Sequence, residues 1–338
     1  MKKEKIMSME LYNESPKGAP VSINSGACPG PKEFGFTPPQ SIGVCDTNKA
    51  FWDKNFSFEN SKYVFVPVPL EKTVSYKKGT AKGPDAILNA SMQVEDFNEI
   101  LMIPIEEIKS CVLKPLDCSG KHSDILDNIE KIIFYLYSNN KFPVILGGEH
   151  SLTIGVVRGI LKHLNHLTII QIDAHSDMRK SYRKNKLSHA STMYNILKLN
   201  DDINLIQIGI RSVCTDELLY RDEFKNRIHT FWDYADIHKD EFKKVLTKLK
   251  GIIYNKNVYL TVDVDGFDFI NSSTGTPEPG GISYYQTIEL FKTIVKSSNL
   301  AGVDFVELAP VKNFHAPDFT IAKLIFNLIV LKENKDGK

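Results

Sequence analysis

Three potential metal ligands, Asp173, His175 and Asp177, stand at alternate positions directly after the apolar run Leu167–Ile172. In an extended segment, residues i, i+2 and i+4 point to one side, so these side chains leave the end of one strand together. Carboxylates held this close repel one another unless a positive charge lies between them. The pattern therefore favours a fold in which a buried strand ends at a cation site.

Two other β-like runs end in the same kinds of side chain. Val258–Val262 leads into Asp263 and Asp265, and Pro143–Leu146 leads into two glycines that allow a sharp turn before His150. One such cluster is only suggestive, because an isolated Asp is as often a cap, a turn residue or a solvated charge. Clusters at three strand ends indicate one shared site.

The charges of these side chains match two divalent cations. Four aspartates carry four negative charges, while His150 and His175 bind metals as neutral imidazoles. Mostly oxygen ligands, a minority of imidazoles and no cysteine suit Mn²⁺ better than a tetrahedral structural Zn²⁺. Two ions about 3.5–4 Å apart can bridge a water and hold it as hydroxide near neutral pH. We therefore expect metal-assisted hydrolysis with two Mn²⁺ per subunit.

These motifs resemble those of the ureohydrolases, the family of arginase and agmatinase, over Tyr63–Lys332. Gly147–Ser151 resembles the family's G-G-[DE]-H-S, Asp173–Asp177 its D-A-H-x-D and Asp263–Asp268 its D-x-D-x-x-D. Glu149 stands where arginases carry Asp, a difference that is common in agmatinase-like members. Further agmatinase-like stretches are Thr73–Pro84, Thr274–Gly281 and His315–Phe319.

The resemblance implies a role for each side chain. The implied metal ligands are His150 and Asp177 on one manganese, His175 and Asp265 on the other, and Asp173 and Asp263 on both. His189 matches the histidine that shuttles protons to the departing amine, and Glu307 the carboxylate that holds the substrate guanidinium. The bridging hydroxide would attack the guanidinium carbon, and a tetrahedral intermediate would collapse to urea and a primary amine.

Elementary chemistry supports both catalytic assignments. A planar, cationic guanidinium is a poor electrophile that needs a carboxylate to orient it, and its leaving amine needs a proton donor such as histidine. Without the other motifs, His189 would be taken for a surface loop histidine. Glu307 follows an apolar run, where an unpartnered carboxylate would be costly.

Runs of β-like sequence alternate with helical patterns, which predicts a three-layer α/β/α fold with a mainly parallel central sheet, as in arginases. Ligands of such sheets bind beyond the carboxyl ends of the strands. The expected strands are Tyr63–Pro67, Pro143–Leu146, Leu167–Ile172, Leu205–Ile210, Val258–Val262 and Gly302–Val306. Helices are expected over Ser123–Asn139, after a capping box at Ser283, and over Asp318–Leu331.

We expect residues 61–338 to form one catalytic domain and residues 1–60 an irregular arm. Ser15–Val44 is rich in Pro, Gly and Ser and lacks periodicity. The arm is either a loosely ordered tail or a segment that packs on the body or on a neighbouring subunit. Packing is favoured by its apolar side chains, namely Phe34, Phe36, Phe51, Trp52, Phe56 and Phe58.

Composition argues against several classes of partner. A net charge of +1 without a basic-aromatic platform argues against nucleic acid. No run approaches the ~20 apolar residues of a membrane span, and no apolar signal segment is evident. Five cysteines without short paired spacings indicate reduced thiols, so we expect a cytoplasmic protein. The resemblance implies a homo-oligomer, a trimer or a hexamer, that acts on a small guanidino compound.

Agmatine, cleaved to urea and putrescine, is the expected substrate. Lys180–Lys186 is basic where agmatinases are typically acidic, so it would repel the ammonium of agmatine unless its side chains point to water. The alternatives are a sibling ureohydrolase that acts on guanidinobutyrate, arginine or guanidine, and a non-catalytic relative. The complete ligand set argues against the last.

Overall fold

A single parallel sheet organises the computed structural model, which describes residues 45–238, 242–270 and 272–336. Its strands lie in the order β4-β1-β5-β10-β9-β6-β7-β8, and each neighbouring pair is parallel. The strands are β1 Tyr63–Val68, β4 Ser110–Val112, β5 Phe142–Gly147, β6 Leu167–Ile172, β7 Ile203–Ile210, β8 Ile228–Trp232, β9 Asn257–Asp263 and β10 Asn299–Val306. A separate antiparallel pair is formed by β2 (Phe97–Asn98) and β3 (Ile103–Pro104).

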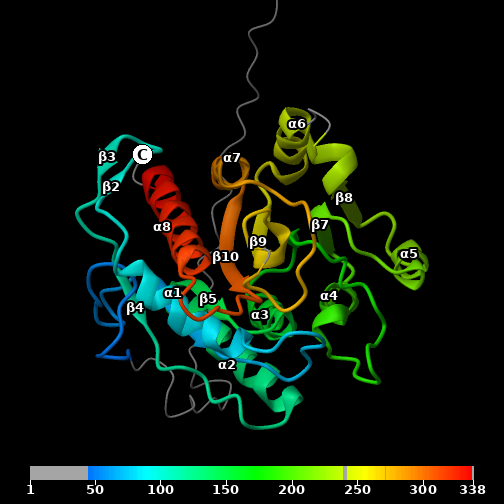
Figure 1. Ribbon diagram of the computed structural model, residues 1–338, viewed down its shortest axis with the longest axis horizontal. Coiled ribbons are helices and arrows are strands. Elements are labelled where there is room, and N and C mark those ends of the chain that lie inside the picture. Colours follow the sequence, from blue (N-terminus) through cyan, green and yellow to red (C-terminus); the bar gives the residue numbers. More distant parts are fainter. Residues whose placement is uncertain (1–44, 239–241, 271, 337–338) are drawn as a thin grey trace, which may run out of the picture.

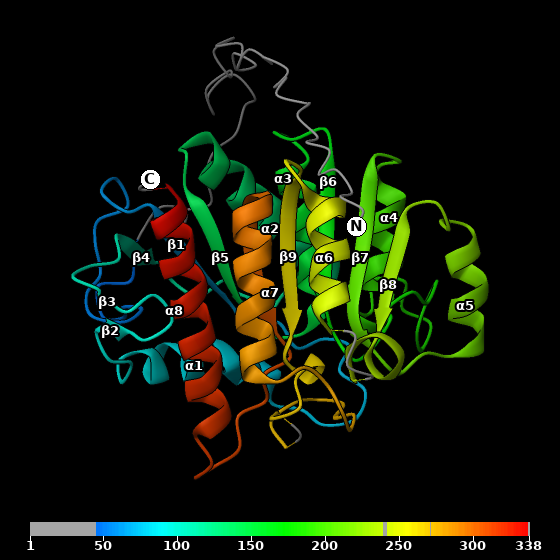
Figure 2. The ribbon, with the colours of Figure 1, turned by 90° about the horizontal axis from the view of Figure 1, so that it is seen from above.

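Helices cover both faces of this sheet (Figures 1 and 2). The helices are α1 Gly83–Ser91, α2 His122–Ser138, α3 Thr153–Ile160, α4 Thr192–Leu199, α5 Thr215–Asp222, α6 Phe242–Ile253, α7 Tyr284–Ser297 and α8 Ala316–Asp336. One hydrophobic cluster joins the sheet to α1, α6, α7 and α8, and the other joins it to α2, α3 and α4. The predicted three-layer α/β/α fold is confirmed.

Strand β6 shows how the alternation of side chains builds the two layers. Ile170 and Ile172 belong to the cluster under α6–α8, whereas Leu167 and Ile169 belong to the cluster under α2–α4. Successive side chains of a strand point to opposite faces, so a strand buried on both sides is apolar throughout. This is why the strand runs of the sequence are continuous rather than alternating.

The six expected strands are present, with ends displaced by at most a few residues. The edge strands β4 and β8 were not expected, because β4 has only three residues and β8 mixes polar with apolar side chains. The capping box at the start of α7 is confirmed, since Ser283 Oγ accepts the N–H of Gln286 and the Gln286 side chain accepts that of Ser283. None of the helices in the described part of the chain is long and apolar enough to cross a bilayer.

The described end of the N-terminal arm packs on the body. Phe51 is 1% exposed and stacks on Phe65 of β1 with ring centroids 4.2 Å apart. Trp52 is also buried, and its indole N–H donates to the carbonyl of Val94 at 3.0 Å. Phe34, Phe36 and Ser15–Val44 lie outside the described residues. The proposed boundary near residue 60 stays a prediction.

Candidate metal centre and active site

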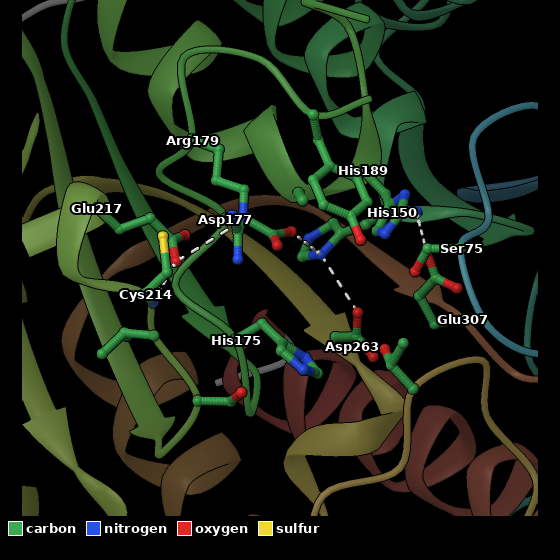
Figure 3. Close-up of a pocket in the computed structure, with 15 residues that line it drawn as sticks. Ser75, His150, His175, Asp177, Arg179, His189, Cys214, Glu217, Asp263 and Glu307 are labelled. Atoms are coloured by element: carbon green, nitrogen blue, oxygen red, sulfur yellow. Dashed lines mark hydrogen bonds and ion pairs between the residues drawn. The ribbon is translucent and has the colours of Figure 1, made fainter. Parts of the chain in front are cut away.

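The predicted site side chains follow the carboxyl ends of four strands that lie side by side, β5, β10, β9 and β6. His150 follows β5, Glu307 follows β10 and Asp263 is the last residue of β9. The motif Asp173–Asp177 follows β6. These segments and the turn that carries His189 surround one cavity of about 240 Å³ (Figure 3).

Two groups of candidate ligands share one carboxylate. In the first group, Nδ1 of His150 lies 3.2 Å from Asp173 Oδ2 and 3.1 Å from Asp177 Oδ2. In the second group, Nδ1 of His175 lies 3.0 Å from Asp265 Oδ2 and 3.7 Å from Asp173 Oδ1. Asp173 therefore lies between two clusters, each able to hold one cation.

Asp263 extends the first group. Its Oδ2 lies 3.3 Å from Nδ1 of His150, while its Oδ1 accepts the backbone N–H of Asp265 at 3.0 Å. In Figure 3 the His150 ring lies between Asp177 and Asp263. All six predicted ligands thus come together, four of them aspartates that are 5% exposed or less.

The hydrogen bonds around His150 indicate that a cation completes the site. The Thr261 hydroxyl donates to Asp304 Oδ1 at 2.6 Å, so it must accept from His150 Nε2, which lies 2.9 Å away. When His150 is neutral, its Nδ1 therefore carries a lone pair; this atom faces three carboxylates and has no hydrogen-bond partner among the described residues. A divalent metal ion could accept the lone pair of Nδ1 and, at the same time, neutralise the charge of the crowded carboxylates.

The electrostatics of the metal-free cluster lead to the same conclusion. Burial and the neighbouring charge of Asp173 raise the pKa of Asp177 to about 7. Burial, Asp265 and Asp173 raise the pKa of Asp263 well above its ordinary value. Asp173 differs, because its contacts with His150 and His175 outweigh burial and lower its pKa. Cations would replace the protons that the crowded carboxylates otherwise retain.

The backbone is unusual where the ligands leave the strands. Asp177 and Glu307 have φ values of +52° and +65°, in the left-handed region that residues other than glycine rarely adopt. The chain bends at Gly148–Glu149, as expected from the two glycines before His150, and these glycines also allow close packing. A Cβ on Gly148 would lie 2.0 Å from the carbonyl oxygen of Leu70.

The two predicted catalytic side chains line the same cavity. His189 begins a short helical turn before α4, and Glu307 is 7% exposed and accepts the backbone N–H of His150 at 2.8 Å. Burial lowers the pKa of His189, and the charge of Glu149 opposes this shift. Burial also raises the pKa of Glu307 well above its ordinary value, with a further rise from Glu149.

The cavity is also lined by residues that the sequence analysis did not assign to the site, including Arg179, Tyr182, Cys214 and Glu217. Glu217 accepts the backbone N–H groups of Met178 at 3.0 Å and of Cys214 at 2.8 Å. Arg179 lies 4.0 Å from Glu217 and over the ring of Tyr182. Arg179 and Tyr182 lie in the loop after β6, whereas Cys214 and Glu217 lie at the start of α5, where Glu217 accepts the N–H of Cys214 as in a capping box. That local pattern indicates a helix start and does not by itself indicate a cavity.

The basic segment after Asp177 lies mostly at the surface. Lys180 pairs with Glu223, and Arg183 is exposed and lies over the ring of Tyr182. Lys184 and Lys186 are exposed as well. From Lys180–Lys186 only Tyr182 reaches the cavity, so the structure favours the alternative in which these basic side chains point to water.

Comparisons with known proteins agree with this geometry. The model of the Arginase family matches residues 61–330. An N(1)-aminopropylagmatine ureohydrolase of Synechocystis is 33% identical, with 81% of this chain and 90% of that protein covered. An agmatinase of Bacillus cereus is 34% identical, with 78% and 89% covered.

A solved structure of the agmatine ureohydrolase of Thermoplasma volcanium superposes with a TM-score of 0.72 at 29% identity, covering 82% of this chain and 92% of that one. The family model spans more than half of the chain, and the metal-ligand motifs lie inside the matched range. The chain belongs to the arginase family, as an agmatinase-like ureohydrolase that hydrolyses C–N bonds in linear amidines.

Proposed function

We propose that the chain is a manganese enzyme that cleaves agmatine to urea and putrescine. The observation that carries this proposal is the pair of ligand groups that share Asp173 at the wall of a cavity also lined by Glu307 and His189. A second candidate substrate is N(1)-aminopropylagmatine, because relatives 32–33% identical to this chain carry that name. Both substrates present a guanidinium to the same site and differ in the tail.

Enzymes of the arginase family depend on two metal ions, and we propose that both are Mn²⁺ here. The residues that would hold them are His150, Asp173, His175, Asp177, Asp263 and Asp265. When bound, two such ions would lower the pKa of a water molecule and supply a nucleophile near neutral pH. Oxygen-rich ligands without cysteine favour manganese over a structural zinc.

Glu307 would orient the substrate. Its carboxylate lies in the cavity and uses one oxygen to accept the N–H of His150, which leaves the other oxygen for a guanidinium N–H. Burial raises the pKa of this carboxyl, and a cationic guanidinium beside it would favour its ionised form. The positive charge of the substrate would therefore stabilise the ionised carboxylate of Glu307.

His189 would donate a proton to the departing amine. It lies in the wall of the same cavity as Glu307, and a histidine can hold and release a proton near neutral pH. As the C–N bond breaks, its electron pair stays on the amine nitrogen, which then takes the proton. The products are urea and a primary amine.

The substrate tail would occupy the part of the cavity lined by Glu217, Arg179 and Tyr182. Glu217 offers a carboxylate and Tyr182 a ring face, and both are suited to an ammonium group. Arg179 contributes a positive charge beside them, which partly offsets that of Glu217. An extended, flexible tail with an amine at its end fits this arrangement better than a short anionic tail.

A substrate panel tests the proposal. Purified protein is loaded with Mn²⁺, and urea release is measured from agmatine, N(1)-aminopropylagmatine, guanidinobutyrate, arginine and guanidine. We expect the highest kcat/KM for agmatine. A higher value for N(1)-aminopropylagmatine would select the second candidate, and activity only on arginine or guanidinobutyrate would refute both.

The same panel tests whether the chain is an enzyme at all. Urea release from none of the compounds would favour the non-catalytic alternative.

We also propose that the protein forms a homo-oligomer, a trimer or a hexamer. Light scattering on the eluate of a sizing column would contradict this if it gave the 38.2 kDa mass of one chain.

A further inference from the structure

A chain of hydrogen bonds joins Glu149 to His189 through one hydroxyl group. Thr73 Oγ1 lies 2.8 Å from Glu149 Oε1 and 3.1 Å from His189 Nδ1, and it accepts the backbone N–H of His189 at 3.0 Å. Glu149 is fully buried and Thr73 is partly buried. The three residues come from the segments after β1 and β5 and from the turn before α4.

Glu149 acts only as an acceptor in this arrangement. Its Oε2 accepts the backbone N–H groups of Lys72 and Thr73, the latter at 2.6 Å. Its Oε1 accepts the hydroxyl of Ser151 at 2.5 Å as well as that of Thr73. Two backbone N–H groups and two hydroxyls therefore surround the two oxygens, an arrangement that suits an acceptor-only carboxylate.

The position of the Thr73 proton determines the tautomer of His189. A hydroxyl has one proton and two lone pairs, and the charged, nearer acceptor Glu149 takes the proton. The lone pairs of Thr73 Oγ1 then accept from the backbone N–H and from Nδ1–H of His189. The hydrogen-bond network therefore assigns the ring proton of neutral His189 to Nδ1.

We propose that Thr73, anchored by Glu149, is a positioning residue that fixes the tautomer and orientation of His189. With Nδ1–H held by Thr73, Nε2 is the ring nitrogen left for the cavity that His189 lines. The catalytic consequence rests on the proposed function. Protonated His189 gives the Nε2 proton to the amine as the C–N bond breaks, and it returns to the neutral Nδ1–H form. Glu149 stays a carboxylate and Thr73 keeps its hydroxyl proton throughout.

The test compares Thr73→Val, which keeps the shape but loses the hydroxyl, with Thr73→Ser, which keeps the hydroxyl. In Mn²⁺-loaded protein, Thr73→Val should lower kcat by at most the roughly 10²–10⁴-fold that loss of a general acid costs. KM and the number of Mn²⁺ bound should stay as in the wild type. Thr73→Ser should restore most of kcat, whereas a purely structural defect would change KM and metal binding as well.

A second measurement does not depend on the substrate. Ring-¹⁵N-labelled full-length protein, kept free of paramagnetic Mn²⁺, reports by NMR which nitrogen of His189 carries the proton, with His189→Ala for assignment. We expect Nδ1–H in the wild type and a loss of that preference in Thr73→Val. Ser188→Ala is the matched control, since Ser188 Oγ is the other hydroxyl near Nδ1, at 3.4 Å, and this variant should keep Nδ1–H.

The two measurements separate failure of the positioning role of Thr73 from failure of the proposed function. An Nε2–H tautomer in the wild type, or wild-type kcat in Thr73→Val, would overturn the inference. If no guanidino compound releases urea but Thr73→Val shifts the tautomer, the positioning role stands and the proposed function fails.

Discussion

Replacement of Thr261 by Val tests whether the buried network behind His150 prepares it to bind metal. The Thr261 hydroxyl links His150 Nε2, 2.9 Å away, to Asp304 Oδ1, 2.6 Å away, and none of the three side chains is more than 1% exposed. Valine has nearly the same shape but cannot accept the Nε2–H proton. His150 could then move this proton to Nδ1, the nitrogen that faces the carboxylates.

The expected size of the effect follows from these contacts. A buried N–H that loses its acceptor costs about 1–3 kcal/mol. Loss of such an outer-shell partner weakens metal binding about 10–100-fold, or about 1.4–2.8 kcal/mol. Asp304 keeps the hydroxyls of Thr153 at 2.8 Å and Tyr259 at 2.6 Å, so the fold should survive.

Calorimetric titration of Mn²⁺ into the metal-free protein measures the change. In Thr261→Val, we expect the site of His150 to lose affinity by about 10–100-fold and the site of His175 to change much less. Thr261→Ser keeps the hydroxyl and should bind as the wild type. Tyr259→Phe removes another donor to Asp304 without touching His150, so it should lower stability and leave Mn²⁺ affinity intact. Wild-type affinity in Thr261→Val, or an equal loss in Tyr259→Phe, would refute the reasoning.

Three other predictions follow from the site and the arm. Asp263→Asn should lower urea release by about 10²-fold or more, because charge stabilisation of several kcal/mol depends on the metals, and full activity would contradict its place among the ligands. Metal loading should release protons, and the number released should fall as the pH rises through about 7, because Asp177 of the metal-free protein ionises there. Calorimetry in buffers of different ionisation enthalpy measures this number, and a number that does not change with pH would contradict the prediction. Phe51→Ala should cost about 3–5 kcal/mol of unfolding free energy in a denaturant titration, because its ring is 1% exposed and stacked on Phe65; a loss below about 1 kcal/mol would mean that the arm contributes little.

The local patterns of the sequence were enough to predict the fold class and to choose the residues of the candidate metal site. Apolar runs such as Leu167–Ile172 are buried on both faces, and parallel strands end at the same edge of their sheet. Ligand-type side chains that follow such runs are therefore brought to one place. The edge strand β8 was missed because its mixed polarity resembles that of a surface loop.

Other features depend on contacts between residues far apart in the chain. Thr73 and His189 are 116 positions apart, and His150 and Thr261 are 111 apart, so no local periodicity connects them. Polar residues inside apolar runs, Asp304 in β10 and Thr261 in β9, were the local signals of the network behind the metal site, but such signals do not identify the partners.

The sequence by itself thus predicted the candidate metal-ligand side chains, because ligand type and strand period are local properties. The tertiary structure decided what these side chains can do. The order β5-β10-β9-β6 places their strand ends side by side, and buried hydroxyls select the ring nitrogen that each histidine presents. Packing makes that selection, since a tautomer depends on where the neighbouring donors and acceptors lie in space.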